Sequence, residues 1–318
     1  MVLRLHGGRR WSRAAAQVVS RRACQARSCS GYAAGVAESN PKVADELERY
    51  VRTGDADIMH TAWPGGFMDR GHRAHDDLRG ALLRRVHELA SGRMHHPIPE
   101  SDATRLTRSK VEPMVRGLFP RAEQDLILAK LEKSVVFLSR ANIDSVLLAK
   151  GFHRTAWDLA NLYLSSVGAE LLGDTAPAIV GLSQETTCFV SAEYFAEQHP
   201  FADFVVHEAA HIFHNCKRST LGLRETRTKE WLLPIDFQER ETFAYSCEAH
   251  ACILRRAKNR PERQALADEY ARTVRVPDER VDSNAVADIL RAAVESRNGW
   301  KVIASRCGQP SARRMSSA

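Results

Sequence analysis

The residues of this chain whose types and spacing could do chemistry begin with two histidines, His207 and His211. On a helix, positions four apart lie one turn apart on the same face, so both imidazoles can reach one metal ion. Glu208 lies about 100 degrees further round the helix and can reach a water molecule on that metal without binding the metal itself. Zinc accepts imidazole and carboxylate ligands, and in catalytic sites it keeps one position open for water, which ionises near neutral pH. These residues therefore predict a catalytic zinc site.

The surroundings of the two histidines fit a helix with one metal-binding face. Residues 204–206 and 212–213 are uncharged, and two alanines separate Glu208 from the second histidine. The pentapeptide 207–211 resembles the HExxH helix of the zincin metallopeptidases. The resemblance covers about residues 175–255, and only the pentapeptide is specific in it. It implies a zinc-dependent metallohydrolase, specifically a peptidase in which Glu208 activates zinc-bound water, with Zn2+ as cofactor and a peptide or protein as substrate.

Zincin subclasses differ in the third zinc ligand. A metzincin would carry glycine at position 214 and histidine at position 217, whereas this chain has His214 and Lys217, so that subclass is excluded. His214 is not expected to complete the site, because positions i, i+4 and i+7 of one straight helix do not readily converge on one ion. The third ligand must therefore come from another element.

Gluzincins take the third ligand from a glutamate on a following helix, and Glu241 begins an ExxA pattern of that kind. The resemblance makes Glu241 the predicted third metal ligand beside the two histidines. Glu248 lies seven residues further, nearly on the same helix face, and either orients a histidine or is itself the ligand. Asp236 is the remaining candidate for the third ligand.

Tyr245 stands four residues after Glu241, where many gluzincins have an aspartate, so the groups that orient the ligands are expected to differ. Tyr245 and His250 are candidate hydrogen-bond donors to the transition state, but the interpretation of Tyr245 that we prefer is helix packing. An alternative function is a non-catalytic, zinc-stabilised binding or regulatory protein that acts through its helical region, residues 39–173. Catalysis is favoured because structural zinc sites are usually closed by four protein ligands, mostly cysteines.

The elements that must position these residues are predicted to be mostly helices. Apolar residues at three- and four-residue spacing predict helices over about 41–51, 76–91, 201–216, 238–258, 261–273 and 284–298, and a mostly helical segment over 123–173. Two β-branched runs, 179–183 and 186–190, predict paired strands, or a strand and an extended loop. In the zincin pattern a strand above the metal helix aligns peptide substrate, and either run could be that strand. The predicted fold is α+β and predominantly helical, with a zincin-like metal helix, a small upstream sheet and a helical N-terminal region.

Four regions are predicted along the chain. They are a disordered or targeting-like extension (1–38), a helical N-terminal region (39–120), a zincin-like catalytic domain (121–300) and a disordered tail (301–318). The boundary at 120 depends on the proline-containing segment 92–120, which is interpreted as a connector with one short helix. The extension is arginine-rich and free of acidic residues, as in organelle transit peptides, although a disordered extension or a misassigned start is the interpretation we prefer.

Charge and cysteine content limit the possible partners. The net charge of +7 equals the number of arginines in residues 1–37, so the rest of the chain is close to neutral and no nucleic acid is expected as a partner. No stretch approaches the roughly 18 to 20 apolar residues of a membrane-spanning helix, so no membrane partner is expected. The seven cysteines are irregularly spaced without a CxxC pair, which favours a reducing, cytoplasmic location. The sequence leaves the oligomeric state open.

Overall fold

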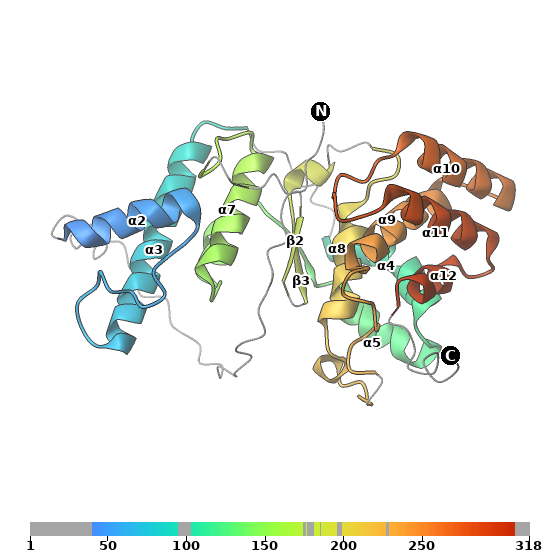
Figure 1. Ribbon diagram of the computed structural model, residues 1–318, viewed down its shortest axis with the longest axis horizontal. Coiled ribbons are helices and arrows are strands. Elements are labelled where there is room, and N and C mark those ends of the chain that lie inside the picture. Colours follow the sequence, from blue (N-terminus) through green and yellow to red (C-terminus); the bar gives the residue numbers. More distant parts are fainter. Residues whose placement is uncertain are drawn as a thin grey trace, which may run out of the picture. The chain divides into compact units, whose positions relative to one another are not determined.

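The computed structural model describes residues 40–94, 103–173, 176, 181–184, 186–195, 199–226 and 229–308. Within these ranges the fold is α+β and predominantly helical with one small sheet, as predicted (Figure 1). None of the helices in these ranges has the length and hydrophobicity required to cross a lipid bilayer. The predicted extension, residues 1–38, lies outside the described residues, as do residues 309–318.

The described residues form two compact units. The helical unit consists of residues 40–94 and 140–176, and the sheet-containing unit consists of residues 103–139 and 181–308, with the gaps given above. This division differs from the predicted regions 39–120 and 121–300. Each unit combines two separate stretches of the chain, so no single boundary near residue 120 divides them.

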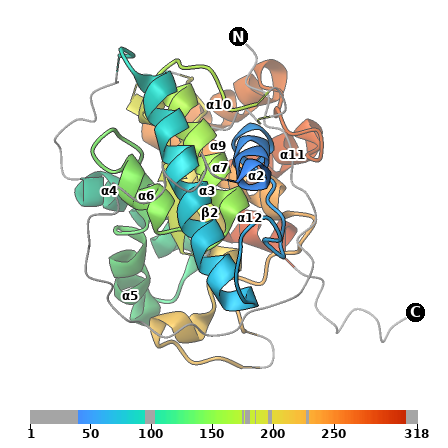
Figure 2. The same ribbon diagram turned by 90° about the vertical axis from the view of Figure 1, so that its left-hand side faces the viewer.

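The helical unit contains α2 (Pro41–Thr53), α3 (Phe67–Ala90), α6 (Ile143–Leu148) and α7 (His153–Ser166). Figure 2 shows α2, α3 and α7 beside one another in this unit. Asn40 caps α2 by accepting a hydrogen bond from the N–H of Lys42, and Gly54 ends the helix in the left-handed conformation, with φ of 75°. A Cβ atom at Gly54 would lie 2.7 Å from Cδ2 of Trp157, so only glycine allows this close approach. The predicted helix 76–91 begins earlier, at Phe67.

A buried polar group holds the helices of this unit together. The guanidinium of Arg79, whose residue is 1% exposed, donates to Oη of Tyr50 and to the carbonyl of Lys150, both at 2.9 Å. Oη of Tyr50 in turn donates to the carbonyl of His153 at 2.9 Å. The ring of His153 packs edge-on against that of Tyr50. Burial, helped by the charge of Arg79, lowers the pKa of His153 to about 4.

The sheet of the other unit has the strand order β1-β3-β2. Strand β1 is Val135–Phe137, β2 is Gly181–Gln184 and β3 is Thr187–Val190. β3 pairs with β1 in parallel and with β2 as an antiparallel neighbour. The predicted strands near 179–183 and 186–190 are thus confirmed for the described residues as β2 and β3. Strand β1 was not predicted, because it lies in a region that the sequence predicted to be mostly helical.

In the sheet-containing unit, other helices pack around the buried helix that carries His207 and His211. Their bounds are α4 (Ala103–Leu118), α5 (Arg121–Leu131), α8 (Phe204–Asn215), α9 (Arg240–Arg256), α10 (Arg260–Thr273), α11 (Ser283–Glu295) and α12 (Gly299–Arg306), with 3-10 turns η1 (Ala192–Phe195) and η2 (Arg218–Leu221). α8 packs against α9, α4 and the β2–β3 pair. Small residues on α9, including Ala244 and Ser246, are completely or almost completely buried there. α9 thus packs along α8 and brings its own side chains close to those of the 207–211 pentapeptide.

Three expectations about helix ends need correction. The metal helix does not begin at Phe201: Asp203 precedes it and caps it by accepting a bond from the N–H of Val206, so the helix begins at Phe204. The segment 92–120 is not mainly a connector, because α4 occupies residues 103–118 with one buried face. The folded part also continues into the predicted tail 301–318, because α12 extends to Arg306 and buries Ile303.

Candidate metal centre

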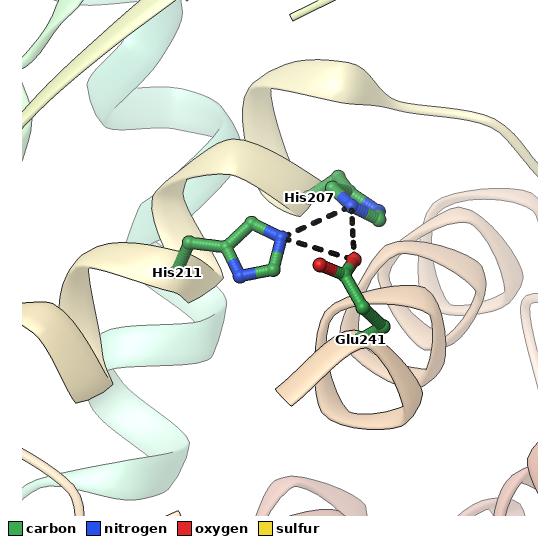
Figure 3. A group of neighbouring side chains, drawn as sticks. All are labelled: His207, His211 and Glu241. Carbon is green, nitrogen blue, oxygen red and sulfur yellow. Dashed lines mark hydrogen bonds and ion pairs between the residues drawn. The ribbon is translucent and has the colours of Figure 1, made fainter. Parts of the chain in front are cut away.

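The two histidines of α8 and the first glutamate of α9 point toward one another (Figure 3). The Nε2 atoms of His207 and His211 are 3.3 Å apart. Oε2 of Glu241 lies 3.7 Å from Nε2 of His207 and 3.4 Å from Nε2 of His211. Among the described residues, His207, His211 and Glu241 form the group whose ligand atoms lie close enough together to hold a metal ion. The structure therefore brings together the three residues that the sequence proposed as ligands.

The spacing of these three atoms fits a zinc ion. Zinc–ligand bonds of about 2.0–2.1 Å at tetrahedral angles place neighbouring ligand atoms about 3.3–3.4 Å apart. The triangle has sides of 3.3, 3.4 and 3.7 Å, and its centre lies about 2.0 Å from each corner. Two imidazole nitrogens and one carboxylate oxygen suit zinc better than magnesium or calcium, which prefer oxygen ligands alone. With three ligands from the described residues, a bound zinc ion would keep its fourth position open.

Glu248 lies on the other side of the His207 ring from this cluster. Its Oε2 is 3.1 Å from Nδ1 of His207, and its Oε1 accepts the backbone N–H of Asp203 at 2.6 Å. A carboxylate accepts hydrogen bonds, so Nδ1 of His207 carries a ring proton toward Glu248 and Nε2 faces the cluster. Of the two glutamates that the sequence left open, Glu241 converges on the histidines and Glu248 orients one of them.

His211 is oriented by its neighbour on the same helix. Its Nδ1 lies 2.9 Å from Nε2 of His214, and Nδ1 of His214 lies 3.1 Å from Oδ1 of Asn215. If Nδ1 of each ring carries the proton, each ring donates to the next acceptor and Nε2 of His211 is left free for the cluster. Burial and nearby positive charge lower the pKa of His214 to about 2, which keeps its ring neutral. The sequence showed the i, i+3 spacing of these histidines, but not this orienting role.

Mutual contacts in the cluster favour a protonated His207 beside an ionised Glu241, as the directions of their pKa shifts indicate. Burial alone would lower the pKa of His207, but its contacts with the carboxylates of Glu241 and Glu248 raise it well above the ordinary histidine range. Burial alone would raise the pKa of Glu241, but its contacts with His207 and His211 hold it far below the ordinary range. Protons and zinc compete for the same lone pairs, so groups that share a proton this strongly are also suited to share a divalent cation.

The predicted catalytic glutamate lies next to strand β2. Glu208 is 8% exposed, and its Oε2 accepts a hydrogen bond from Oγ of Ser183 at 2.5 Å. A Cβ atom at Gly181 would lie 2.6 Å from Oε1 of Glu208, so a larger residue there would displace the carboxylate. Within the described part of the chain no hydrogen bond to Oε1 is seen, which leaves that oxygen available to a water molecule. The contribution of Ser183 was not recognised in the sequence.

The remaining candidates do not join the cluster. The ring of Tyr245 packs edge-on against His207 with centroids 4.6 Å apart, and its buried hydroxyl has no hydrogen-bond partner among the described residues. His250 is buried against Trp300, with ring centroids 4.8 Å apart. Asp236 precedes α9, where its side chain accepts the N–H of Gln238 at 2.9 Å.

Comparison of the chain with protein-family models, with curated proteins and with solved structures finds no match. A function must therefore be argued from the geometry of the cluster and from the chemistry of its donor atoms.

Proposed function

We propose that this protein is a zinc-dependent metallohydrolase that cleaves peptide bonds. The observation that carries the proposal is the convergence of two imidazoles and the carboxylate of Glu241 beside a second carboxylate, Glu208, which lies on the metal helix but outside the converging group. A zinc site that only stabilises a fold is usually closed by four protein ligands, whereas the described residues supply three. This arrangement resembles that of the zincin peptidases.

Each residue of the site has a defined role in the proposed reaction. His207, His211 and Glu241 would hold the zinc ion, which when bound would acidify water to give a nucleophile at neutral pH and would polarise the substrate carbonyl. Glu208 takes a proton on Oε1 and then delivers it to the leaving amine. Ser183 holds Oε2 of the same carboxylate, so the group stays in one orientation without having to reorganise during the reaction.

The sheet supports a peptide as the substrate. β2 is an edge strand, because its partner in the described sheet is β3 on one side only. An extended peptide can add to such an edge through main-chain hydrogen bonds, and it would then run past Glu208, which β2 contacts at Gly181 and Ser183. β3, the other candidate strand, is paired on both sides and offers no free edge.

The test combines metal content with hydrolysis. We expect purified protein to hold about one zinc per chain and to cleave members of a broad peptide library. Glu208→Gln should retain zinc, because it changes no predicted ligand, while hydrolysis falls by about 100- to 10,000-fold through loss of the general base. Zinc binding without any hydrolysis would instead favour the non-catalytic binding protein, and protein without zinc would contradict both functions.

A further inference from the structure

Arg280 reaches the predicted third ligand from outside the cluster. It belongs to the segment between α10 and α11, and its Nη2 lies 3.4 Å from Oε1 of Glu241. The other oxygen of that carboxylate, Oε2, is the one that faces His207 and His211. The two oxygens of Glu241 therefore have different partners, a guanidinium on one side and the imidazoles on the other.

Asp278 fixes the orientation of Arg280. Its Oδ1 accepts the backbone N–H and the Nε–H of Arg280, both at 2.9 Å, and its Oδ2 contacts Nη2. Asp278 is 5% exposed, so this carboxylate is itself held in the folded unit. A guanidinium is a planar group of five donors in a fixed geometry, so it can bridge two carboxylates in a way that a lysine ammonium cannot.

We propose that Arg280, held by Asp278, is a positioning residue that keeps Glu241 with one oxygen toward the metal and the other turned away from it. This inference rests on the proposed zinc site. Glu241 then contributes a single oxygen, and the position needed for water stays open. Without Arg280 the carboxylate is free to rotate, so that it offers both oxygens to the metal or turns out of the cluster.

Geometry and charge predict opposite effects of removing Arg280. Its positive charge opposes the binding of a cation, so a purely electrostatic role means that zinc binds more tightly when Arg280 is replaced by a neutral residue. The side chain is 54% exposed, however, and solvent screens the charge of such a group. The loss of orientation therefore outweighs the loss of repulsion. Replacing a residue that orients a metal ligand typically weakens metal binding by about 10- to 100-fold.

The experiment compares three variants of the full chain: Arg280→Gln, Arg280→Lys and Asp278→Asn. Zinc affinity is measured by competition with a chelator, and the visible absorption spectrum of the Co2+-substituted protein reports the coordination number. We expect all three variants to bind zinc about 10- to 100-fold more weakly. The Co2+ spectrum should change from that of the wild type, because four-coordinate Co2+ absorbs more strongly than five-coordinate Co2+.

Arg275→Gln is the matched control. Arg275 lies in the same segment and donates to the carbonyls of Ala271 and Val274, so its loss removes the same charge without touching Glu241. Thermal unfolding of the metal-free proteins shows which variants fold, and the two conservative changes keep the test valid if Arg280→Gln does not.

Two results would overturn the positioning role. One is tighter zinc binding by Arg280→Gln together with unchanged binding by Arg280→Lys, which is the pattern of a purely electrostatic role. The other is a set of variants that match the wild type in both affinity and spectrum. In both cases the wild type still binds zinc, so the proposed function survives. A wild-type protein that binds no zinc contradicts the proposed function itself.

Discussion

At the scale of single residues, the two histidines of the metal helix are oriented by partners of different charge. The ring of His207 faces the carboxylate of Glu248, whereas the ring of His211 faces the neutral ring of His214. A carboxylate behind an imidazole raises its basicity more than a neutral acceptor does. His207 is therefore expected to be the stronger electron-pair donor of the two histidines toward a shared cation. Among the described residues, Glu241 is the acidic side chain whose oxygen converges with the two histidines.

The two glutamates of α9 should differ in their effects on metal binding. Glu241→Gln replaces a ligand oxygen with a neutral amide, so a site with three protein ligands should lose stoichiometric zinc. Glu248→Gln removes only an orienting acceptor, so affinity should fall by about 10- to 100-fold. Zinc retained after gel filtration, followed by chelator competition, measures both effects.

The control for this pair is Glu230→Gln, which removes an exposed acid that pairs with Lys217. It should leave zinc binding unchanged. Loss of zinc in Glu248→Gln with full retention in Glu241→Gln would reverse the roles assigned to the two residues.

At the scale of elements, the sequence predicts the relative positions of site residues well when those residues lie on one helix. The relative position of His207 and His211 follows from helical spacing alone, and the helix predicted over residues 238–258, observed over 240–256, is the one that carries Glu241. Contacts between distant segments could not be predicted in this way. Strand β1 has three residues and pairs in parallel with a strand about fifty positions later, so no local pattern marks it. The approach of Arg280 to Glu241 likewise depends on the packing of the segment after α10.

Helix α12 is the clearest case of a missed element, and it should contribute strongly to stability. Trp300 is 5% exposed and packs so closely on α4 that a Cβ atom at Gly117 would lie 2.2 Å from Cδ1 of its ring. Trp300→Ala removes this buried ring, so the free energy of unfolding should fall by about 3–5 kcal/mol. Chemical denaturation measures the change. Exposed Lys301 provides the control, because Lys301→Ala should change stability by less than about 0.5 kcal/mol.

At the scale of the whole molecule, two histidines, one in each unit, affect the pH dependence of stability in opposite directions. In the metal-free sheet-containing unit the pKa of His207 is raised, so its contribution to stability is complete at low pH and is lost as the pH rises through that pKa. In the helical unit the pKa of His153 is lowered to about 4, so its contribution is present above the unfolded pKa of about 6.5 and is lost as the pH falls. The pH dependence of the free energy of unfolding is therefore a sum in which the contributions of His207 and His153 have opposite signs.

The part contributed by His153 can be isolated by substitution. Its ring is surrounded by Tyr50, Arg79, His60 and His75, and the charge of Arg79 opposes its protonation. In the wild type, unfolding is favoured below about pH 6.5 because the unfolded chain takes up a proton there that the folded chain takes up only near pH 4. His153→Gln cannot take up this proton. Its free energy of unfolding should therefore fall less between pH 6.5 and 4, by on the order of 1–2 kcal/mol after solvent screening.

Urea denaturation of metal-free protein at several pH values measures this difference, because zinc would add a pH dependence of its own. The contribution of His207 is the same in both proteins, so it cancels in the comparison. The matched control is His72→Gln, which removes an exposed histidine of α3 and should leave the pH profile of the wild type unchanged. If the free energy of unfolding changes with pH in the same way in the wild type and in His153→Gln, then His153 is protonated in the folded chain as readily as in the unfolded one. The surroundings of His153, including Arg79, would then not determine the acid stability of the helical unit.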